Sequence, residues 1–392
     1  MNLLIVSGYW PTQSNPISGL FVVQQLSALV RQNCEATVII ATTKGKRESP
    51  HLSLKQLRLP SESIQLVEVS LLRLPEILSS WPGGIWLNTL SVGMKLNRTI
   101  RQLAAEGKVF KGCLLHGIRY MGLSVPLWGR WIKGKTVMVL HGVDPFIEKA
   151  GNLPRITSMM KPVACVCHRF VLVGQPLLRH AHLLGLSENQ LKIVANGTDL
   201  PELEKIFDHQ RSLNETRRVV SISNLVALKG IDLNLKALAR LSEKHPELKW
   251  EYRVIGDGEE RQKLELLARE LGVASQVTFL GRISYQDTMH ELARSDVFSL
   301  PSWGEAFGIV YLEAMARARP VVGCFDNGAA DIICTGNDGL LIPPHNEFQL
   351  TCALETLLYN PELCRRIGRE GRKTAEKFSW EVNAHEILAL LD

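Results

Sequence analysis

The sequence predicts an α/β protein built from two doubly wound parallel sheets. The length of 392 residues exceeds one ordinary domain, and 45% of the residues are hydrophobic, as in globular proteins. Short Val/Ile/Leu-rich runs alternate with helical patterns in both halves, which is typical of parallel sheets covered by helices on both faces. The predicted strands are 2–8, 35–43, 113–117, 136–142 and 169–174 in the first half, and 218–223, 250–258, 276–282, 296–302 and 319–326 in the second.

The predicted domain boundaries follow from a polar segment without a sheet pattern, LPELEKIFDHQRSLNETRR. It separates an N-terminal Rossmann-like domain over residues 1–200 from a C-terminal one over 218–378, with 201–217 as the linker. Residues 379–392 are expected to form a helix that packs back on the N-terminal domain. Ligands of doubly wound sheets bind beyond the carboxyl ends of the strands. With two such sheets facing each other, those ends are expected to line one cleft, so residues directly after strands are the site candidates.

Composition and charge argue against several classes of protein. The net charge of +6 comes from dispersed basic residues without a nucleic-acid-binding signature, so no nucleic acid partner is expected. The N-terminal MNLLIVSG is interpreted as a buried strand rather than a signal peptide, and no apolar stretch is long enough to span a membrane. Eight scattered cysteines without a CxxC pair predict free thiols in the cytoplasm and no metal site. Residues 161–166, before Cys167, are predicted to enter a strand.

Two glutamates in the segment GEAFGIVYLEA carry the main functional prediction. Glu305 is expected in the loop after a strand, and Glu313 about one and a half turns into the following helix. The backbone of Ala306, Phe307 and Gly308 is expected to form the helix N-terminus, whose free N–H groups favour an anion such as phosphate. The two carboxylates then accept hydrogen bonds from hydroxyl groups on opposite sides of that phosphate, one on a sugar and one on a ribose.

This segment resembles the E-x7-E element of glycosyltransferase family 4, whose members have the two-domain GT-B fold. The resemblance implies that Glu305 binds the transferred sugar, that Glu313 binds the nucleotide ribose, and that the amides near Phe307 and Gly308 hold the donor diphosphate. It also implies retention of configuration at the anomeric carbon.

Other segments of the second half resemble the same family. VVSISNLVALKG is similar to the segment that opens the family's second domain, and the resemblance implies that Lys229 neutralises the donor diphosphate. Ser223 and Asn224 stand where glycine and arginine are usual, so Asn224 offers a hydrogen bond in place of a second cation. Arg282 follows a strand at the loop that lies near the nucleotide base in the family. Asp331 stands where the family has glutamate, and it is interpreted as structural.

The first half contributes candidates with a more diffuse resemblance. Gly19 lies where the loop after the first strand becomes a helix at about Phe21, and it is expected to let that loop close over the donor phosphates. TVMVLHGVDP resembles the family's HG-x-D element, which implies that His141 hydrogen-bonds a sugar hydroxyl and that Asp144 orients the acceptor or His141. His116 also ends a predicted strand and is given no role.

The sequence therefore predicts a retaining glycosyltransferase of the hexosyltransferase type, EC 2.4. It would move a sugar from a nucleotide-diphosphate donor to a glycan or lipid-linked acceptor in cell-surface polysaccharide or glycolipid synthesis. No D-x-D motif is found, so neither a metal nor another cofactor is expected. The alternatives are a nucleotide-sugar epimerase of the same fold and a non-catalytic scaffold. A nicotinamide-dependent oxidoreductase is disfavoured because SGYWPTQSNPISG lacks the G-x-G-x-x-G turn.

Residues 72–103 suggest contact with a membrane. Trp81 and Trp86 flank a Pro-Gly-Gly turn, and Lys95, Arg98 and Arg101 follow. One hypothesis is peripheral contact with the anionic inner face of the plasma membrane and a polyprenyl-linked acceptor. The alternative is a core helix with a loop before it.

Overall fold

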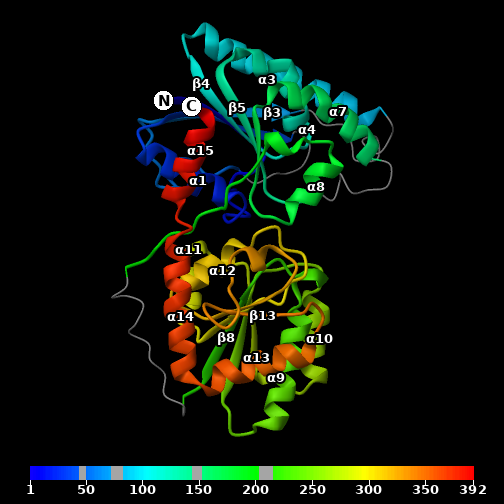
Figure 1. Ribbon diagram of the computed structural model, residues 1–392, viewed down its shortest axis with the longest axis vertical. Helices are drawn as coiled ribbons and strands as arrows, with labels where there is room; N and C mark the ends of the chain where they lie inside the picture. Colours follow the sequence, from blue (N-terminus) through cyan, green and yellow to red (C-terminus); the bar gives the residue numbers. More distant parts are fainter. Residues whose placement is uncertain (44–49, 72–82, 144–151, 203–214) are drawn as a thin grey trace. The chain divides into compact units, whose positions relative to one another are not determined.

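The computed structural model of the chain divides into two compact units (Figure 1). Unit 1 comprises residues 1–195 and 380–392, and unit 2 comprises residues 196–379. Most of the predicted linker, residues 203–214, lies outside the described part of the chain. The residues that the structure describes are 1–43, 50–71, 83–143, 152–202 and 215–392.

Unit 1 is built on a seven-stranded parallel sheet in the order β3-β2-β1-β4-β5-β6-β7. Leu3, Leu4 and Val6 of the central strand β1 are fully buried, as expected for a sheet covered on both faces. The strands are β1 (Asn2–Ser7), β2 (Glu35–Thr43), β3 (Ile64–Leu71), β4 (Phe110–His116), β5 (Ile132–Leu140), β6 (Arg169–Leu172) and β7 (Leu191–Ile193).

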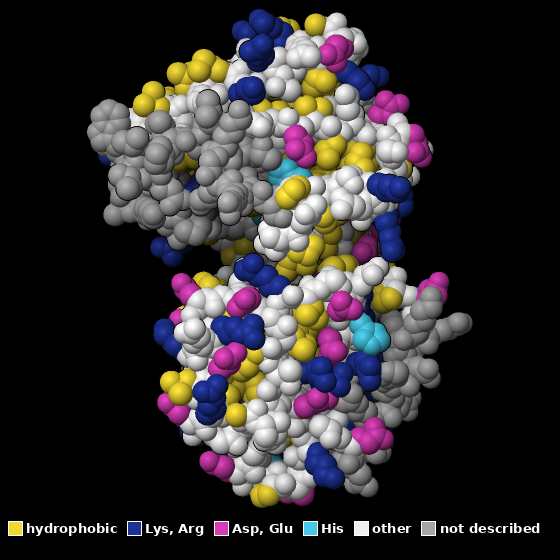
Figure 2. Space-filling model, turned by 180° about the vertical axis from the view of Figure 1, so that it is seen from behind, with side chains coloured by type: hydrophobic (Ala, Val, Ile, Leu, Met, Phe, Trp, Pro, Cys, Tyr) yellow, Lys and Arg dark blue, Asp and Glu magenta, His cyan; other side chains and the backbone are white. Residues whose placement is uncertain are grey.

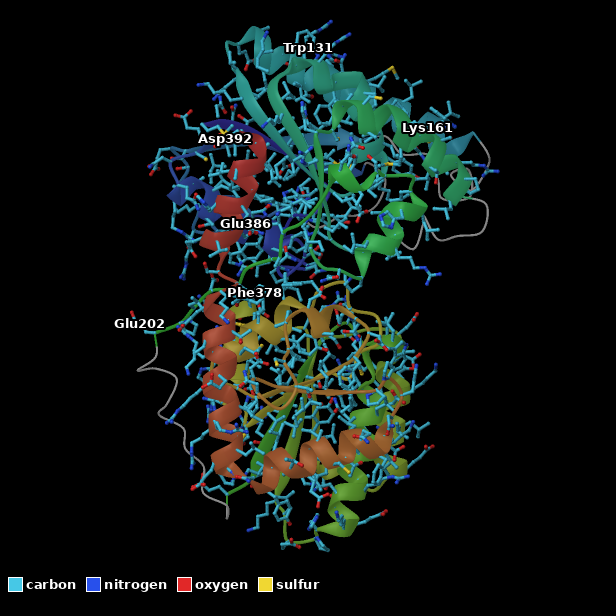
Figure 3. The ribbon with its side chains drawn as sticks, in the orientation of Figure 1. Trp131, Lys161, Glu202, Phe378, Glu386 and Asp392 are labelled. Atoms are coloured by element: carbon cyan, nitrogen blue, oxygen red, sulfur yellow. The ribbon has the colours of Figure 1, made fainter. Side chains whose placement is uncertain are left out.

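Helices cover this sheet, and the last of them comes from the far end of the chain. α15 packs against α1 and β5, and it carries Glu386 and ends one residue before the terminal Asp392 (Figures 1 and 3). Gln25 on α1 donates a hydrogen bond to Asn383 on α15, and both side chains are buried. The α-helices are α1 (Leu20–Arg31), α3 (Gly84–Ala105), α4 (Tyr120–Leu123), α5 (Val125–Trp128), α7 (Leu153–Val166), α8 (Leu177–Leu183) and α15 (Trp380–Leu391).

The prediction of a strand entry at residues 161–166 is wrong, because these residues form the last turns of α7. Ile156, Met159, Met160 and Val163 are all buried, at the i, i+3, i+4, i+7 spacing of one helix face. The apolar run before Cys167 is therefore the end of a helical stripe, and the strand begins later, at Arg169.

Unit 2 has a six-stranded parallel sheet in the order β10-β9-β8-β11-β12-β13. Its strands are β8 (Arg217–Ile222), β9 (Trp250–Ile255), β10 (Val277–Gly281), β11 (Val297–Ser299), β12 (Val321–Cys324) and β13 (Leu340–Ile342). Its α-helices are α9 (Ile231–Lys244), α10 (Arg261–Glu270), α11 (Tyr285–Ala293), α12 (Ile309–Met315), α13 (Glu347–Tyr359) and α14 (Pro361–Glu376). Both units are therefore Rossmann-like, as the sequence predicts.

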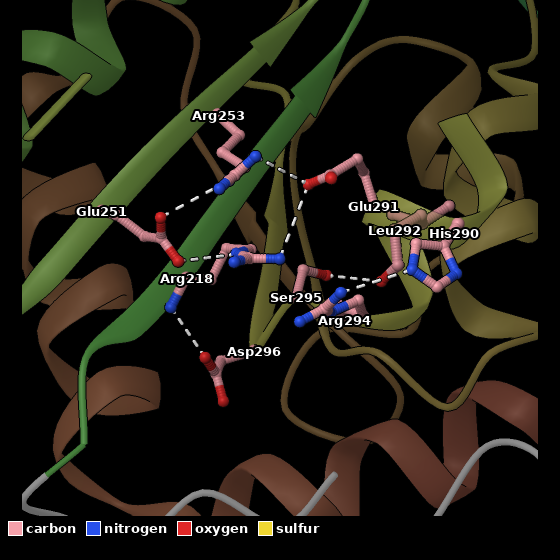
Figure 4. A network of polar contacts seen from close by, with 9 residues as sticks. All are labelled: Arg218, Glu251, Arg253, His290, Glu291, Leu292, Arg294, Ser295 and Asp296. Atoms are coloured by element: carbon pink, nitrogen blue, oxygen red, sulfur yellow. Dashed lines mark hydrogen bonds and ion pairs between the residues drawn. The ribbon is translucent and has the colours of Figure 1, made fainter. Parts of the chain in front are cut away.

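Charged side chains pair with one another at the amino ends of the unit 2 strands (Figure 4). Arg218 in β8 donates to Glu251 in β9 at 2.7 Å, and Asp296 before β11 accepts from the Arg218 backbone N–H at 2.7 Å. Glu291 lies 3.5 Å from Arg218 and 3.3 Å from Arg253. This network joins the starts of three strands, at the edge of the sheet opposite to its carboxyl ends.

Over the face of unit 2 seen in Figure 2, basic and acidic side chains are interspersed, and neither sign gathers into one large patch. Among the described residues, no helix combines the length and the apolar character needed to cross a bilayer.

Candidate active site

Two predicted site residues meet at the carboxyl edge of the unit 2 sheet. β8 and β11 are neighbours in that sheet, so the loops that follow them start side by side. Lys229 ends a short 3-10 turn (Ala227–Lys229) after β8, and Glu305 lies in the loop between β11 and α12. Lys229 Nζ donates to Glu305 Oε1 at 2.5 Å. The two side chains are 18% and 13% exposed, so this ion pair is only partly open to water.

Backbone contacts hold these two loops together. The carbonyl oxygen of Leu228 accepts from the Trp303 N–H and from the Ser302 hydroxyl, both at 3.1 Å. Gly230 follows with φ +66, and a Cβ there would lie 2.5 Å from the carbonyl oxygen of Pro301. Only glycine allows this close approach, so the backbone fixes Lys229 relative to the Glu305 loop.

Glu313 is buried inside unit 2 and does not project into water. It is the fifth residue of α12, and the residue is 9% exposed. Burial raises the pKa of its carboxyl to about 7, against the opposing effects of the Arg317 charge and a hydrogen bond from Tyr285. The folded protein therefore binds a proton at this carboxyl more readily than water-exposed glutamates do.

Backbone conformation and backbone contacts position the residues between the two glutamates. Gly308 has φ +91 and stands at the N-cap of α12. Phe307 is buried, with its ring 6.1 Å from that of Phe378, which lies between α14 and α15 (Figure 3). Its ring therefore serves the core, and only its backbone is placed to meet a ligand. A Cβ at Gly328 would lie 2.4 Å from the Phe307 backbone, and the Gly328 N–H donates to the carbonyl oxygen of Glu305.

The other predicted donor residues lie at the same sheet edge but, among the described residues, are not hydrogen-bonded to the Lys229–Glu305 ion pair. Asn224 follows β8 and Arg282 follows β10, and both are exposed. In the described chain neither has a hydrogen bond or ion pair to Lys229 or Glu305. Ala306 is half-buried beside Glu305. Asp331 ends the 3-10 turn Gly328–Asp331, which the Asn327 side chain caps by accepting from the Ala329 N–H.

Unit 1 contains a cavity of about 500 Å³ where β1, β4 and β5 end. His116, His141, Tyr9, Phe21 and Arg119 are among its lining residues. His116 Nδ1 and His141 Nε2 are 2.8 Å apart, within hydrogen-bond distance. Burial lowers the pKa of His116 to about 3, and burial together with His116 lowers that of His141 well below its usual value. Both rings are therefore neutral at physiological pH.

The remaining candidates of the first half are Gly19 and Asp144, and the structure describes only Gly19. Gly19 has φ +70 at the N-cap of α1, and a Cβ there would lie 2.6 Å from the backbone nitrogen of Trp10. The close approach of the Trp10 backbone therefore requires glycine at this position. Asp144 lies outside the described residues. Sequence reasoning missed the cavity walls Tyr9 and Phe21, although Tyr9 comes two residues after β1, at a position where ligands of such sheets bind.

Comparisons with known proteins agree with this architecture. Residues 203–374 match the family described as "Glycosyl transferases group 1". A D-inositol 3-phosphate glycosyltransferase of Corynebacterium jeikeium is 29% identical over 354 residues, which cover 81% of this chain and 84% of the relative. An uncharacterized glycosyltransferase of Methanocaldococcus jannaschii is 23% identical over 346 residues, with coverages of 79% and 94%.

Solved structures of similar fold cover the whole chain. Sucrose-phosphate synthase from Thermosynechococcus elongatus has a TM-score of 0.76 at 16% identity, with 98% of that chain covered. Anabaena HepE, solved with UDP and glucose, has a TM-score of 0.73 at 18% identity, with 99% covered. The two Rossmann-like units make the GT-B fold. These matches indicate a glycosyltransferase, and residues 203–374 are similar to the group 1 glycosyl transferases.

Proposed function

We propose that this protein is a retaining glycosyltransferase of family 4. It moves a sugar from a nucleotide-diphosphate donor to a hydroxyl of a glycan or lipid-linked acceptor. The observation that carries the proposal is the Lys229–Glu305 ion pair at the carboxyl edge of the unit 2 sheet, with buried Glu313 eight residues along the chain. The fold supports it, since HepE has the same fold and was solved with UDP-glucose.

The proposed donor chemistry starts from the ion pair. A donor diphosphate competes for the Lys229 ammonium, and Glu305 is then released to accept a hydrogen bond from the sugar. Lys229 stabilises the negative charge that builds up on the leaving diphosphate as the glycosidic bond breaks. With this cation and the backbone amides of residues 306–308, the reaction proceeds without a bound metal. Glu313 accepts from the ribose.

We assign supporting roles to the remaining candidates of unit 2 and to unit 1. Asn224 donates a hydrogen bond to the diphosphate, and Arg282 lies beside the nucleotide base. Gly19 brings its loop to the donor phosphates. His141 hydrogen-bonds a sugar hydroxyl at the unit 1 cavity, and Asp144 orients the acceptor or His141. The reaction belongs to cell-surface polysaccharide or glycolipid synthesis, in the cytoplasm.

Three experiments test the proposed reaction. A thermal-shift screen of UDP, GDP, ADP and their sugars identifies the donor, because a ligand that binds only the folded protein raises its melting temperature. Glu305→Gln, which keeps the shape of the side chain, is then expected to abolish transfer while leaving the circular dichroism spectrum unchanged. Turnover near the wild-type level would exclude the sugar-binding role. Product analysis with the donor alone separates transfer from epimerisation.

We also propose that α3 contacts an anionic membrane. Trp86, Leu87, Leu90 and Met94 are 53%, 48%, 45% and 58% exposed, and their spacing places them within a 100° arc of the helix. Arg98 and Arg101 are exposed, and Arg101 falls within the same arc. The apolar stripe can bury itself among the acyl chains of a bilayer, and the basic side chains are attracted to anionic headgroups. Trp81 of the predicted segment lies outside the described residues.

Vesicle flotation tests the membrane contact. The wild-type protein is expected to float with phosphatidylglycerol vesicles at low salt, and a Trp86→Ser, Leu90→Ser, Met94→Ser variant is expected to remain at the bottom of the gradient. Phe348→Ser in unit 2 removes an aromatic side chain that is more exposed than Trp86 and serves as the control. Equal flotation of the triple variant and the wild type would refute the contact.

A further inference from the structure

Two histidines from neighbouring strands form a bonded pair in unit 1. His116 is the last residue of β4, and His141 comes directly after β5, the next strand in the sheet. Their rings are stacked, with centroids 5.1 Å apart and planes 17° from parallel. His116 is 3% exposed, and both side chains line the cavity of about 500 Å³. Phe21 packs on His141 with ring centroids 4.3 Å apart, and Tyr9 lies edge-on at 6.0 Å.

The 2.8 Å contact between His116 Nδ1 and His141 Nε2 couples the tautomers of the two rings. A neutral imidazole has one N–H and one bare nitrogen. If His116 donates from Nδ1, then His141 Nε2 is bare and its proton lies on Nδ1. If His141 donates from Nε2, then His116 Nδ1 is bare and its proton lies on Nε2. The two neutral rings must therefore carry the same tautomer, both Nδ1–H or both Nε2–H.

The two outer nitrogens, His116 Nε2 and His141 Nδ1, have no hydrogen-bond partner among the described residues, although both are buried. In either tautomer one outer nitrogen is a donor and the other an acceptor. A buried polar atom without a partner is unfavourable, and such an atom in a native structure calls for an explanation, such as a bound water, an ion or a ligand. Both nitrogens have almost no accessible surface, so a hydroxyl-bearing ligand in the cavity would bond to them only after the side chains that cover them move.

We propose that His116 is a positioning residue that couples its own tautomer to that of His141, so that the pair presents one donor and one acceptor nitrogen to a ligand. This inference rests on the proposed function of His141 as the group that bonds a sugar hydroxyl. His116 holds the Nε2 side of the His141 ring while Phe21 holds one ring face, so the ring is fixed before a ligand arrives.

Nitrogen-15 NMR of the histidine rings tests the coupling in the unliganded protein. His116→Gln and His141→Gln identify the two rings in the spectrum. In the wild type both are expected to be neutral at pH 7 and to show the same tautomer. Opposite tautomers, or a charged ring, would overturn the proposal, and this criterion does not depend on how any variant folds.

Matched variants then separate positioning from packing. His116→Phe keeps a flat ring without the bonding nitrogen, and His116→Asn keeps an amide atom near the Nδ1 position. We expect His141 to become a mixture of tautomers in the Phe variant and to keep one tautomer in the Asn variant. His180→Phe replaces another buried histidine of unit 1, on α8, and is the control. An unchanged His141 signal in the Phe variant would refute the coupling.

Kinetics with the nucleotide sugar found by thermal shift give the functional outcome. Loss of one neutral hydrogen bond predicts a fall in kcat of about tenfold for His116→Phe, with a smaller change in the donor KM and recovery in His116→Asn. A full kcat with a mixed His141 tautomer would disprove positioning while leaving the pair intact. If no nucleotide sugar is turned over, the proposed function fails, and the ring spectra still decide the pairing.

Discussion

At the residue scale, the Lys229–Glu305 ion pair contributes both to the stability of the fold and, as proposed, to donor binding. Removing one partner of a partly buried ion pair leaves the other charge poorly compensated, so a substitution affects both stability and binding. A donor diphosphate offers Lys229 a second anionic partner at the same place. The effect of a Lys229 substitution on ligand binding must therefore be separated from its effect on stability. Measuring ligand affinity in a variant that is shown to be folded does this.

Lys229→Ala is expected to weaken UDP binding by about tenfold or more, because a charge-assisted hydrogen bond contributes roughly 1.5–3 kcal/mol. Isothermal titration calorimetry measures the dissociation constant. Lys236→Ala is the matched control, since Lys236 pairs with Asp232 at 2.9 Å on the exposed side of α9. Affinity that is equal in the two variants would remove Lys229 from the donor site.

Glu313 predicts a pH dependence of stability. Its pKa in the folded protein, about 7, lies above the ordinary value of 4.5, so the folded state favours the protonated carboxyl. The resulting stability is present below pH 4.5 and is lost as the pH rises to about 7, by up to about 3 kcal/mol in the free energy of unfolding. Glu313→Gln removes this titration.

Urea unfolding of the wild type and of Glu313→Gln between pH 4.5 and 8 measures the effect. The stability of the Gln variant relative to the wild type is expected to increase with pH and to level off above pH 7. A constant difference across this range would mean that the carboxyl titrates alike in the folded and unfolded chain.

At the element scale, two left-handed glycines differ in what surrounds them. Gly230, between the Lys229 turn and α9, leaves no room for a Cβ beside Pro301, whereas Gly272 after α10 has φ +72 and open space. Gly272→Ala is expected to cost about 1 kcal/mol from backbone strain alone. Gly230→Ala adds a steric overlap and is expected to cost clearly more. Equal unfolding free energies for the two variants would show that the loops near Lys229 relax freely.

Long, buried strands were predicted from the sequence, whereas short or partly exposed strands were missed. β2 was predicted with its bounds, because the Val-Ile-Ile run of this interior strand is buried without interruption. β3, β7 and β13 were missed: the first lies at a sheet edge with a mixed burial pattern, and the other two are three-residue edge strands. Short edge strands carry too few buried residues for a periodic signal.

The candidate site was predictable only where topology decides it. The family resemblance assigned both Lys229 and Glu305 to the donor, and because the neighbouring strands β8 and β11 end at one edge, the two side chains form a bond. The contact of His116 with His141 depends on two side-chain rotamers and on the ring packing of Phe21, which no spacing in the sequence reveals. Gly19 was assigned to a ligand from the sequence, whereas the close approach of the Trp10 backbone is visible only in three dimensions.

At the scale of the whole molecule, the chain leaves unit 1 after residue 195 and returns to it at residue 380. The return is anchored by Asn383, whose side chain accepts from Gln25 at 2.6 Å and donates to the carbonyl oxygen of Ala195 at 2.7 Å. The last turns of the sequence therefore complete the core of the first unit. The stability of unit 1 depends on residues that follow all of unit 2 in the chain.

Asn383→Ala tests this dependence by differential scanning calorimetry. The substitution leaves the buried Gln25 amide and the partly buried Ala195 carbonyl without their partner, which costs roughly 2–4 kcal/mol and lowers the melting temperature of a unit of this size by about 5 °C or more. We expect separate transitions for the two units, with Gly230→Ala lowering that of unit 2 and Asn383→Ala that of unit 1. Glu381 lies on the same helix as Asn383 and forms an exposed ion pair with Arg31 on α1. Glu381→Ala breaks this pair and is expected to change neither transition by more than a degree or two. If Asn383→Ala and Gly230→Ala lowered one and the same transition, α15 would be stabilising the chain as a single cooperative body rather than unit 1 alone.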